Sequence, residues 1–281
     1  MLLSRPNPKR RILIVGEGRE TEYNYFVGFR NAFESELADS AVSIVVRRGK
    51  GGDARAIVKT AIEEARKFEP NRGRGDRVFL LLDTEGVRRA PELVPAEALA
   101  RQKNIQIVYS SPAFEYWVLC HFHSIPRGYF NDCSAVITEL DKHWESVCNS
   151  QYDKADKELF ERLSPRLPIA RSQGLDFDLW HTRIGVSAAK SNPSSQVYEL
   201  IARLVGVRSN ERCPIDGKWK PLGSTSIDVF SKGDVMPVVN NELLLGCGHR
   251  IASLAAQVHT RTIEILLRHS ERSHVYHQRI R

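Results

Sequence analysis

Ile12-Leu13-Ile14-Val15-Gly16-Glu17-Gly18 opens the part of the chain that decides the fold. Four consecutive apolar residues before a glycine-flanked turn are typical of a buried parallel strand and the turn that ends it. Apolar side chains then recur at helical spacing in the following segment, residues 21–37, at Tyr25, Phe26, Phe29, Phe33 and Leu37. The sequence therefore predicts a buried strand followed by an amphipathic helix.

The same alternation continues to residue 109. Further apolar runs at 42–46, 78–82 and 105–109 predict strands. A helix that Asp53 can cap, and another around 96–102, separate these strands. Strands and helices that alternate in this way form right-handed crossovers and a mainly parallel sheet with helices on both faces. We therefore expect an α/β fold for this region.

The middle of the chain predicts mainly helices. Residues 114–122 are apolar and aromatic, as in a buried helix, and 134–163 show helical polar faces. Pro165 and Pro168 predict an interruption, and the stretch around 172–184 is typical of a loop.

This pattern divides the chain into three parts. Residues 11–110 are the expected α/β core, and 111–205 are a helical region packed on that core, which ends in a helix starting near Asn192. Residues 206–281 are a small extension with a basic, His-rich end. Its many Gly, Pro, Ser and Asp residues predict short strands and turns at 211–240, and an apolar stripe predicts a helix at 251–267. We expect this extension to serve in docking or substrate selection.

Composition and charge narrow the class of protein. The chain has 281 residues, of which 42 % are hydrophobic and 27 % charged, and a net charge of +7, which favours a polyanionic partner such as nucleic acid. Its apolar runs are too short to cross a bilayer, and its first residues lack the long apolar core of a secretory signal. Five cysteines without a Cys-x-x-Cys pair argue against a disulfide framework. We therefore expect a cytoplasmic protein with no membrane partner.

Acidic residues follow two of the expected strands. Glu17 comes directly after the first strand, and Asp83 and Glu85 come at the end of the third. The carboxyl ends of parallel strands meet at one edge of a sheet, and an extended backbone would point Asp83 and Glu85 the same way. Converging carboxylates repel one another unless a cation lies between them, and oxygen ligands select Mg²⁺ or Mn²⁺. The alternative is that acids end strands simply because loops are polar.

Three blocks of sequence resemble the RloB family and, more broadly, the opening of Toprim-type domains. They are residues 12–26, residues 110–122 and Asn192-Pro193-Ser194-Ser195, and the resemblance spans roughly 11–205. It implies a Toprim-like catalytic core and a metal-dependent nuclease that cleaves RNA or DNA in bacterial restriction and phage defence. It also implies control by a partner ATPase, and leaves a homo-oligomer open.

The resemblance also implies roles for individual acids. Glu17 matches the Toprim glutamate, a general acid or base beside the metal, and Asp83 matches the first metal-binding aspartate. Glu85 departs from the aspartate that the pattern has there, so that the metal site can be weakened or shifted. Glu115 lies in the Phe-Glu-x-Trp block, either as a fourth acid near the metal or as a buried structural acid.

Three more residues are candidates with an ordinary alternative each. His121 is either catalytic or a hydrogen-bonded core residue, because it does not share a helical face with Glu115. Lys154 either neutralises a phosphate in the transition state or is a surface lysine. Asn192 either caps the following helix or presents amide groups to phosphate.

Basic residues suggest a rim for a nucleic-acid backbone. Arg47, Arg48 and Lys50 lie in a glycine-containing segment that lacks the residue order of a phosphate-binding loop, so this chain is not expected to hydrolyse nucleotides. Arg88 and Arg89 follow the third strand. Together with Arg72, Arg74 and Arg77, these residues are expected on loops that flank the acidic edge of the sheet. The alternative is that loop arginines serve only solubility.

Two functions remain in competition. The first is a Mg²⁺- or Mn²⁺-dependent phosphodiesterase in which Glu17, Asp83 and Glu85 form the metal and acid–base set. The second is a non-catalytic adaptor that keeps the Toprim scaffold and binds nucleic acid or a nucleotide signal. The second function remains an alternative because Glu85 replaces the aspartate of the pattern and can weaken the metal site.

Overall fold

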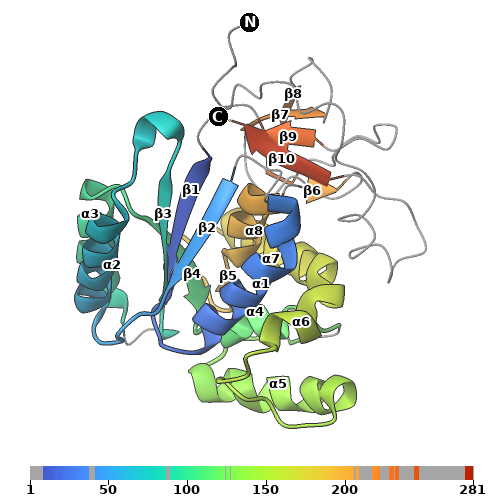
Figure 1. Cartoon of the computed structure of the whole chain (residues 1–281). Helices are drawn as coiled ribbons and strands as arrows, with labels where there is room; N and C mark the ends of the chain where they lie inside the picture. The colour runs from blue at the N-terminus through green and yellow to red at the C-terminus, as the bar shows by residue number, and fades with distance from the viewer. Residues whose placement is uncertain are drawn as a thin grey trace, which may run out of the picture.

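The computed structural model shows an α/β body and a second, smaller sheet (Figure 1). It describes residues 9–37, 42–86, 89–123, 125–126 and 128–205, and short pieces of the remainder at 207–208, 217–221, 228–230, 232–233, 244–246 and 276–280.

The main sheet confirms the expected fold class. Its strands are β1 (Arg10–Val15), β2 (Val42–Arg47), β3 (Arg77–Asp83), β4 (Gln106–Ser111) and β5 (Ser194–Ser195). They lie in the order β2-β1-β3-β4-β5, and the first four strands of the chain pair in parallel. The short β5 pairs antiparallel with β4.

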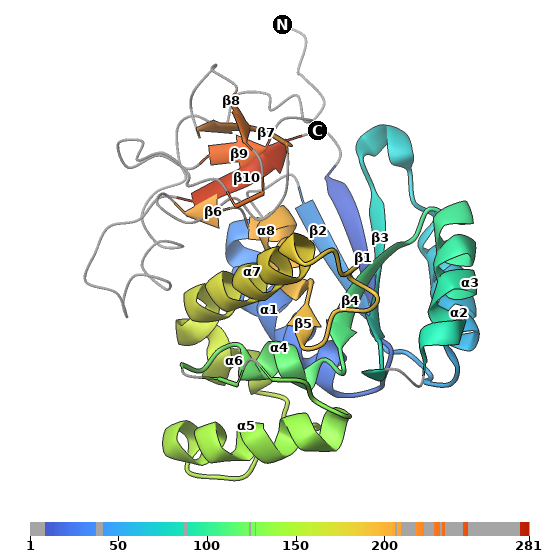
Figure 2. The same ribbon diagram turned by 180° about the vertical axis from the view of Figure 1, so that it is seen from behind.

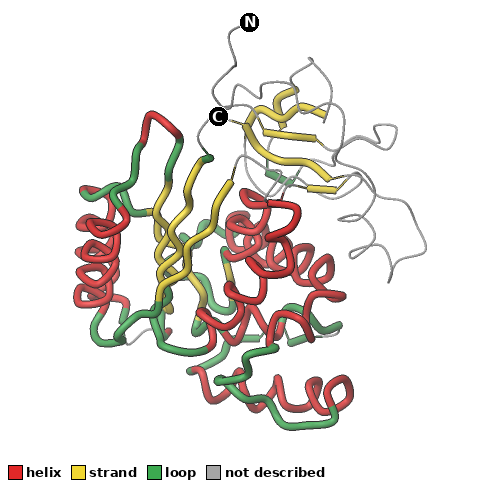
Figure 3. Tube along the Cα trace, in the orientation of Figure 1, coloured by secondary structure: helices red, strands yellow, loops and turns green. Residues whose placement is uncertain are grey.

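Helices cover both faces of the sheet, as predicted (Figure 3). One face packs against α2 (Ala54–Phe68) and α3 (Ala90–Gln102), because alternate strand residues such as Leu13 point to that side. Asp53 caps α2 as expected, and its side chain accepts a hydrogen bond from the Ala56 N–H at 2.7 Å.

The other face packs against the helix α1 and the middle region of the chain. The helices on this side are α1 (Thr21–Leu37), α4 (Glu115–Leu119), α5 (Cys133–Cys148), α6 (Leu159–Leu163), α7 (Leu167–Arg183) and α8 (Val197–Val205). The predicted helices at 114–122 and 134–163 are confirmed in part, since the second is divided into α5 and α6. No helix in the described ranges is both long and apolar enough to span a bilayer.

The loop predicted around 172–184 is wrong, because α7 runs through that stretch (Figure 2). A short 3-10 turn, η3 (Ser164–Arg166), precedes α7, and Pro168 lies in the first turn of the helix, where a missing N–H breaks no helical bond. Gly174 is needed inside the helix, because a Cβ there would lie 2.9 Å from Cδ1 of Tyr198. Both residues therefore fit a helix that packs closely on α8.

A second sheet comes from the C-terminal extension. Its strands are β6 (Val207–Arg208), β7 (Gly217–Pro221), β8 (Asp228–Phe230), β9 (Leu244–Gly246) and β10 (Tyr276–Ile280), in the order β10-β6-β9-β7-β8. Short strands within 211–240 were predicted and are confirmed. The apolar stripe at 251–267 lies outside the described residues. Figures 1 and 2 place this sheet at the end of the molecule where β1 begins.

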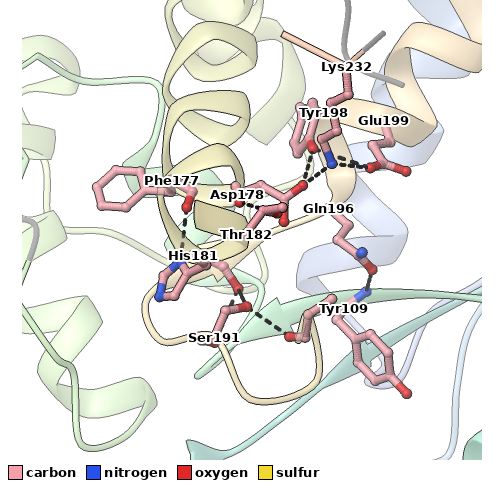
Figure 4. A network of polar contacts seen from close by, with 12 residues as sticks. Tyr109, Phe177, Asp178, His181, Thr182, Ser191, Gln196, Tyr198, Glu199 and Lys232 are labelled. Atoms are coloured by element: carbon pink, nitrogen blue, oxygen red, sulfur yellow. Dashed lines mark hydrogen bonds and ion pairs between the residues drawn. The ribbon is translucent and has the colours of Figure 1, made fainter. Parts of the chain in front are cut away.

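Lys232 joins the extension to the helical layer (Figure 4). Its ammonium group pairs with Asp178 of α7 and lies 2.9 Å from Oε1 of Glu199 of α8. The Tyr198 hydroxyl also donates to Asp178, at 2.6 Å. We call these four residues the Lys232 cluster.

Candidate active site

A cavity opens at the carboxyl edge of the main sheet. Strand order reverses between β1 and β3, because β2 lies on one side of β1 and β3 on the other, and ligands of such sheets bind at this point. The cavity has a volume of about 410 Å³. We call it the acidic cavity, and its lining residues are Glu17, Gly18, Arg19, Glu20, Thr21, Glu22, Gly51, Gly52, Asp83, Glu85, Arg89, Phe114, Glu115 and Lys154.

The backbone that carries Glu17 is fixed by the glycine-containing loop after β2. Gly49 donates its N–H to the Gly18 carbonyl at 2.8 Å, and Gly51 donates to the Glu17 carbonyl at 3.1 Å. A Cβ at Gly49 would lie 1.9 Å from the Glu17 oxygen, so that only glycine allows this approach. The loop therefore positions the acid rather than a phosphate.

Glu17 lies at the base of the cavity with both carboxylate oxygens bonded. Oε2 accepts a hydrogen bond from the Asp83 N–H at 2.8 Å, and Oε1 accepts one from Nη1 of Arg89 at 2.7 Å. Burial raises the pKa of Glu17 to about 7, although the Arg89 guanidinium acts in the opposite direction. A carboxyl group with this pKa can take up or release a proton near neutral pH.

Arg89 lies inside the site, so its predicted place on a basic rim is wrong. Only 6 % of its side chain is exposed, and Nη2 donates to Oε1 of Glu85 at 2.7 Å. The arginine turns inward because Glu17 and Glu85 offer it carboxylates that would otherwise be unpaired there.

Glu85 lies beyond β3, which ends at Asp83. The prediction that the side chains of Asp83 and Glu85 point the same way assumed an extended backbone, which Glu85 does not have. Its φ of 47° is left-handed, which turns the chain away from β3. Its side chain is 52 % exposed and pairs with Arg89. The structure thus brings Glu17, Asp83 and Glu85 to one cavity, with a guanidinium between Glu17 and Glu85.

Glu22 is a site residue that the sequence analysis missed. It lies in the first turn of α1, is 6 % exposed, and accepts a hydrogen bond from the Gly18 N–H at 3.2 Å. Burial raises the pKa of Glu22, and the charge of Glu115 adds to the effect. Its position directly after the Glu17 turn is the sequence signal that could have found it.

Three neighbouring carboxylates of the cavity act on the pKa of Asp83. Burial raises its pKa well above the usual value, and Glu17, Glu22 and Glu115 raise it further. The cavity therefore holds more negative charge than its own cations balance.

Glu115 and Lys154 form the opposite wall of the cavity. Nζ of Lys154 lies 3.0 Å from Oε1 of Glu115, which also accepts a hydrogen bond from the Thr21 hydroxyl at 3.2 Å. The Cys133 thiol donates to Oε2 at 3.2 Å. Burial by itself would lower the pKa of Lys154, but Glu115 and Cys133 together outweigh this effect and raise it. The structure thus brings both predicted residues to the cavity, and Glu115 also has the bonding partners of a buried acid.

His121 is not brought to the cavity. It is fully buried, its Nδ1 lies 3.0 Å from the Trp117 carbonyl, and its Nε2 lies 3.3 Å from the Tyr25 hydroxyl. Burial lowers the pKa of His121 to about 3, so the ring is neutral at physiological pH. These contacts favour a core role over the catalytic one.

Three predicted rim residues lie on the loop after β2 or beside it, and each pairs with an acid. Arg48 lies 2.8 Å from Glu20, Lys50 lies 3.1 Å from Glu63, and Arg47 lies 3.5 Å from Glu64. All six side chains are at least partly exposed, so these pairs are weak and open to exchange for phosphate. Arg88 lies outside the described residues.

The prediction that Arg72, Arg74 and Arg77 flank the acidic edge of the sheet is wrong. Arg72 and Arg74 form the 3-10 turn η1 (Arg72–Arg74) ahead of β3, and Arg77 begins that strand. They therefore lie at the amino edge of the sheet, opposite the acidic cavity.

Asn192 neither caps a helix nor faces the cavity. Its Oδ1 accepts a hydrogen bond from the Phe130 N–H at 3.2 Å, and its Nδ2 donates to the Phe130 carbonyl at 2.8 Å. The following helix, α8, begins only at Val197. The side chain instead ties the loop before α5 to the segment before β5.

The donor set of the cavity fits a hard divalent cation. Carboxylates dominate its lining, and oxygen is the ligand that Mg²⁺ and Mn²⁺ prefer. Within the described ranges, however, no three Asp, Glu, His or Cys side chains are already grouped as ligands for one ion. An ion bound here would draw acids together that now repel one another.

Comparison with known proteins gives one match. The family model described as RloB-like protein matches residues 12–204. No curated protein and no solved structure matches the chain.

Proposed function

The chain belongs to the RloB-like family, and from this premise we propose that it is a metal-dependent nuclease that hydrolyses phosphodiester bonds of RNA or DNA in the cytoplasm. The observation that carries the proposal is the unbalanced charge of the acidic cavity. Six carboxylate side chains line the cavity against three cationic ones. Burial raises the pKa values of Glu17, Glu22 and Asp83, and perturbed carboxyl groups in a cleft are typical of a functional site.

Mg²⁺ or Mn²⁺ would be held by Asp83 and Glu22, whose carboxylates belong to the same cavity as Glu17 and Glu115. When bound, such an ion polarises a phosphoryl oxygen and lowers the pKa of water. Neither acid has an ion pair with a cation among the residues that the structure describes, so that both are available as ligands.

The remaining side chains supply proton transfer and charge. Glu17, with its pKa of about 7, takes a proton from the attacking water or gives one to the leaving oxygen. Lys154 lies at the cavity wall and neutralises charge that develops on the phosphate, while Glu115 orients its ammonium group. Glu115 is thus a positioning residue.

The surroundings of the site support the rest of the proposal. Arg47 ends β2, and Arg48 and Lys50 lie on the loop after it, whose Gly51 and Gly52 line the cavity. These three residues can bind a nucleic-acid backbone there. The family resemblance favours a role in phage defence. A nuclease of this kind damages its own host unless it is restrained, which favours control by a partner ATPase.

Cleavage with and without metal tests the proposal. The full chain is incubated with end-labelled tRNA, single-stranded DNA and duplex DNA in Mg²⁺, Mn²⁺ or EDTA. We expect cutting that needs the metal and that falls by about 10³-fold in Asp83→Asn, because the substitution removes a metal ligand. Glu97→Gln, on the exposed side of α3, is the matched control and keeps full activity.

An adaptor that binds nucleic acid without cutting it is the second candidate. The observation that favours it is the Arg89 guanidinium, which already pairs with Glu17 and Glu85. Salt-sensitive binding that survives EDTA, together with no cutting in either metal, alone or with a candidate partner ATPase added, would favour the adaptor over the nuclease.

A further inference from the structure

Arg89 is a buried guanidinium whose four terminal N–H groups all have acceptors. Nη1 donates to Oε1 of Glu17 at 2.7 Å and to the Asp83 carbonyl at 2.9 Å. Nη2 donates to Oε1 of Glu85 at 2.7 Å and to the Gly52 carbonyl at 3.1 Å. Four bonds, two of them to carboxylates, hold the planar group in one orientation.

These acceptors belong to three separate segments of the chain. Glu17 follows β1, Gly52 ends the loop after β2, and Asp83 and Glu85 lie at the end of β3. The guanidinium therefore ties together the three strand ends that form one side of the acidic cavity. An arginine keeps its charge at every physiological pH, so this cation is permanent.

Arg89 and Lys154 do not pair with every acid of the cavity. Lys154 pairs with Glu115, and Arg89 pairs with Glu17 and Glu85. Glu22 and Asp83 make no ion pair with any residue in the described part of the chain. Glu22 and Asp83 are thus the acids among these five that have no cation of their own, while Glu17 and Glu85 share the single charge of Arg89.

We propose that Arg89 is a resident cation that takes the place of a divalent ion between Glu17 and Glu85 and thereby limits the acidic cavity to a single divalent ion, at Glu22 and Asp83. The inference rests on the proposed function, because it concerns the ion that the nuclease uses. Arg89 acts through its neighbours and is a positioning residue. It keeps Glu17 oriented and out of the metal's ligand set.

Counting bound ions tests this role without measuring activity. The metal-free full chain is titrated with Mn²⁺ by calorimetry, and electron paramagnetic resonance counts the bound ions. We expect one ion in the wild type and two in Arg89→Gln, because the substitution leaves Glu17 and Glu85 without their cation. Arg101→Gln, at the exposed end of α3, is the matched control and binds one ion.

The possible outcomes separate this inference from the proposed function. Two ions in the wild type, or one ion in a folded Arg89→Gln, would overturn the inference and leave the nuclease proposal intact. A wild type that binds no Mn²⁺ would overturn both. If circular dichroism shows Arg89→Gln to be unfolded, the wild-type count still decides, and Arg89→Lys, which keeps the charge, is expected to bind one ion.

Discussion

The acidic cavity and the Lys232 cluster both bury carboxylates, but they balance the charge differently. In the Lys232 cluster, one ammonium group serves Asp178 and Glu199, and Arg203 approaches Glu199 to 3.9 Å on its other side. Burial by itself would lower the pKa of Lys232, but the two acids raise it. In the acidic cavity the acids outnumber the cations, and three carboxyl pKa values rise instead.

The difference shows how a structural ion cluster can be told from a candidate binding site. A cluster whose charges cancel stabilises the packing of the elements that carry it, here α7, α8 and the extension. A cluster with surplus charge costs stability unless a ligand removes the surplus. Four measurements test whether the two groups of acids differ in this way.

The largest effect on stability is expected from Lys232→Met. This substitution leaves the Lys232 cluster with surplus negative charge, as in the acidic cavity. Two acids lose their shared cation, so the free energy of unfolding should fall by about 3 kcal/mol, measured by urea denaturation. Adding Asp178→Asn removes one of the unpaired charges and should recover part of the loss. A Lys232→Met variant as stable as the wild type would show that the Lys232 cluster does not stabilise the packing of α7, α8 and the extension.

Divalent ions should act only on the cavity. At a Mg²⁺ concentration 100 times the dissociation constant, the wild type should gain about 2.7 kcal/mol in unfolding free energy, because the folded state alone binds the ion. Asp83→Asn should lose this gain, and Lys232→Met should keep it. An equal gain in Asp83→Asn would place the ion elsewhere.

The pH dependence of stability should come from the cavity and carry a definite sign. The pKa of Glu17 rises from 4.5 to about 7 on folding, so the folded chain holds a proton that the unfolded chain has released. In EDTA, the contribution of this group to stability should therefore be fully present below pH 4.5 and fall by about 2.5 kcal/mol between pH 5 and pH 8. Glu17→Gln should flatten this part of the curve.

The smallest effect on stability is expected at the exposed rim. Arg48→Gln and Lys50→Gln each remove a solvent-exposed pair and should change unfolding free energy by no more than about 0.5 kcal/mol. Nucleic-acid binding should nevertheless weaken, and the slope of log affinity against log salt should fall by about 1 per residue. Unchanged binding in both variants would remove the rim from the proposal.

Periodicity in the sequence predicted the α/β core because each of its elements has one simple pattern. Buried parallel strands are continuous apolar runs, and Asp53 marks the start of α2. The helix α7 was missed because Pro168 and Gly174 normally argue against a helix. Only the packing of Tyr198 against Gly174 explains why a glycine is acceptable there, and a packing partner cannot be read from local sequence.

The candidate site was predicted less completely than the fold. Strand ends mark Glu17, Asp83 and Glu85, and a family block marks Glu115. All four line the cavity, as does Lys154, which no strand end or family block marks. The place of Arg89 could not be foreseen, because a loop arginine is usually exposed and four acceptors from three segments hold this one inside. Such a set of acceptors exists only after the chain has folded.

Gly49 has a consequence for the motions of the loop that follows β2. A segment with three glycines among four residues would ordinarily exchange its amide hydrogens with solvent within moments. Here the Gly49 and Gly51 amides are engaged by the carbonyls of Gly18 and Glu17, at 2.8 and 3.1 Å. Deuterium would therefore enter these two positions slowly, at the pace of the strands beside them. The glycines of this loop make it rigid, because they let two backbones touch where side chains would have kept them apart.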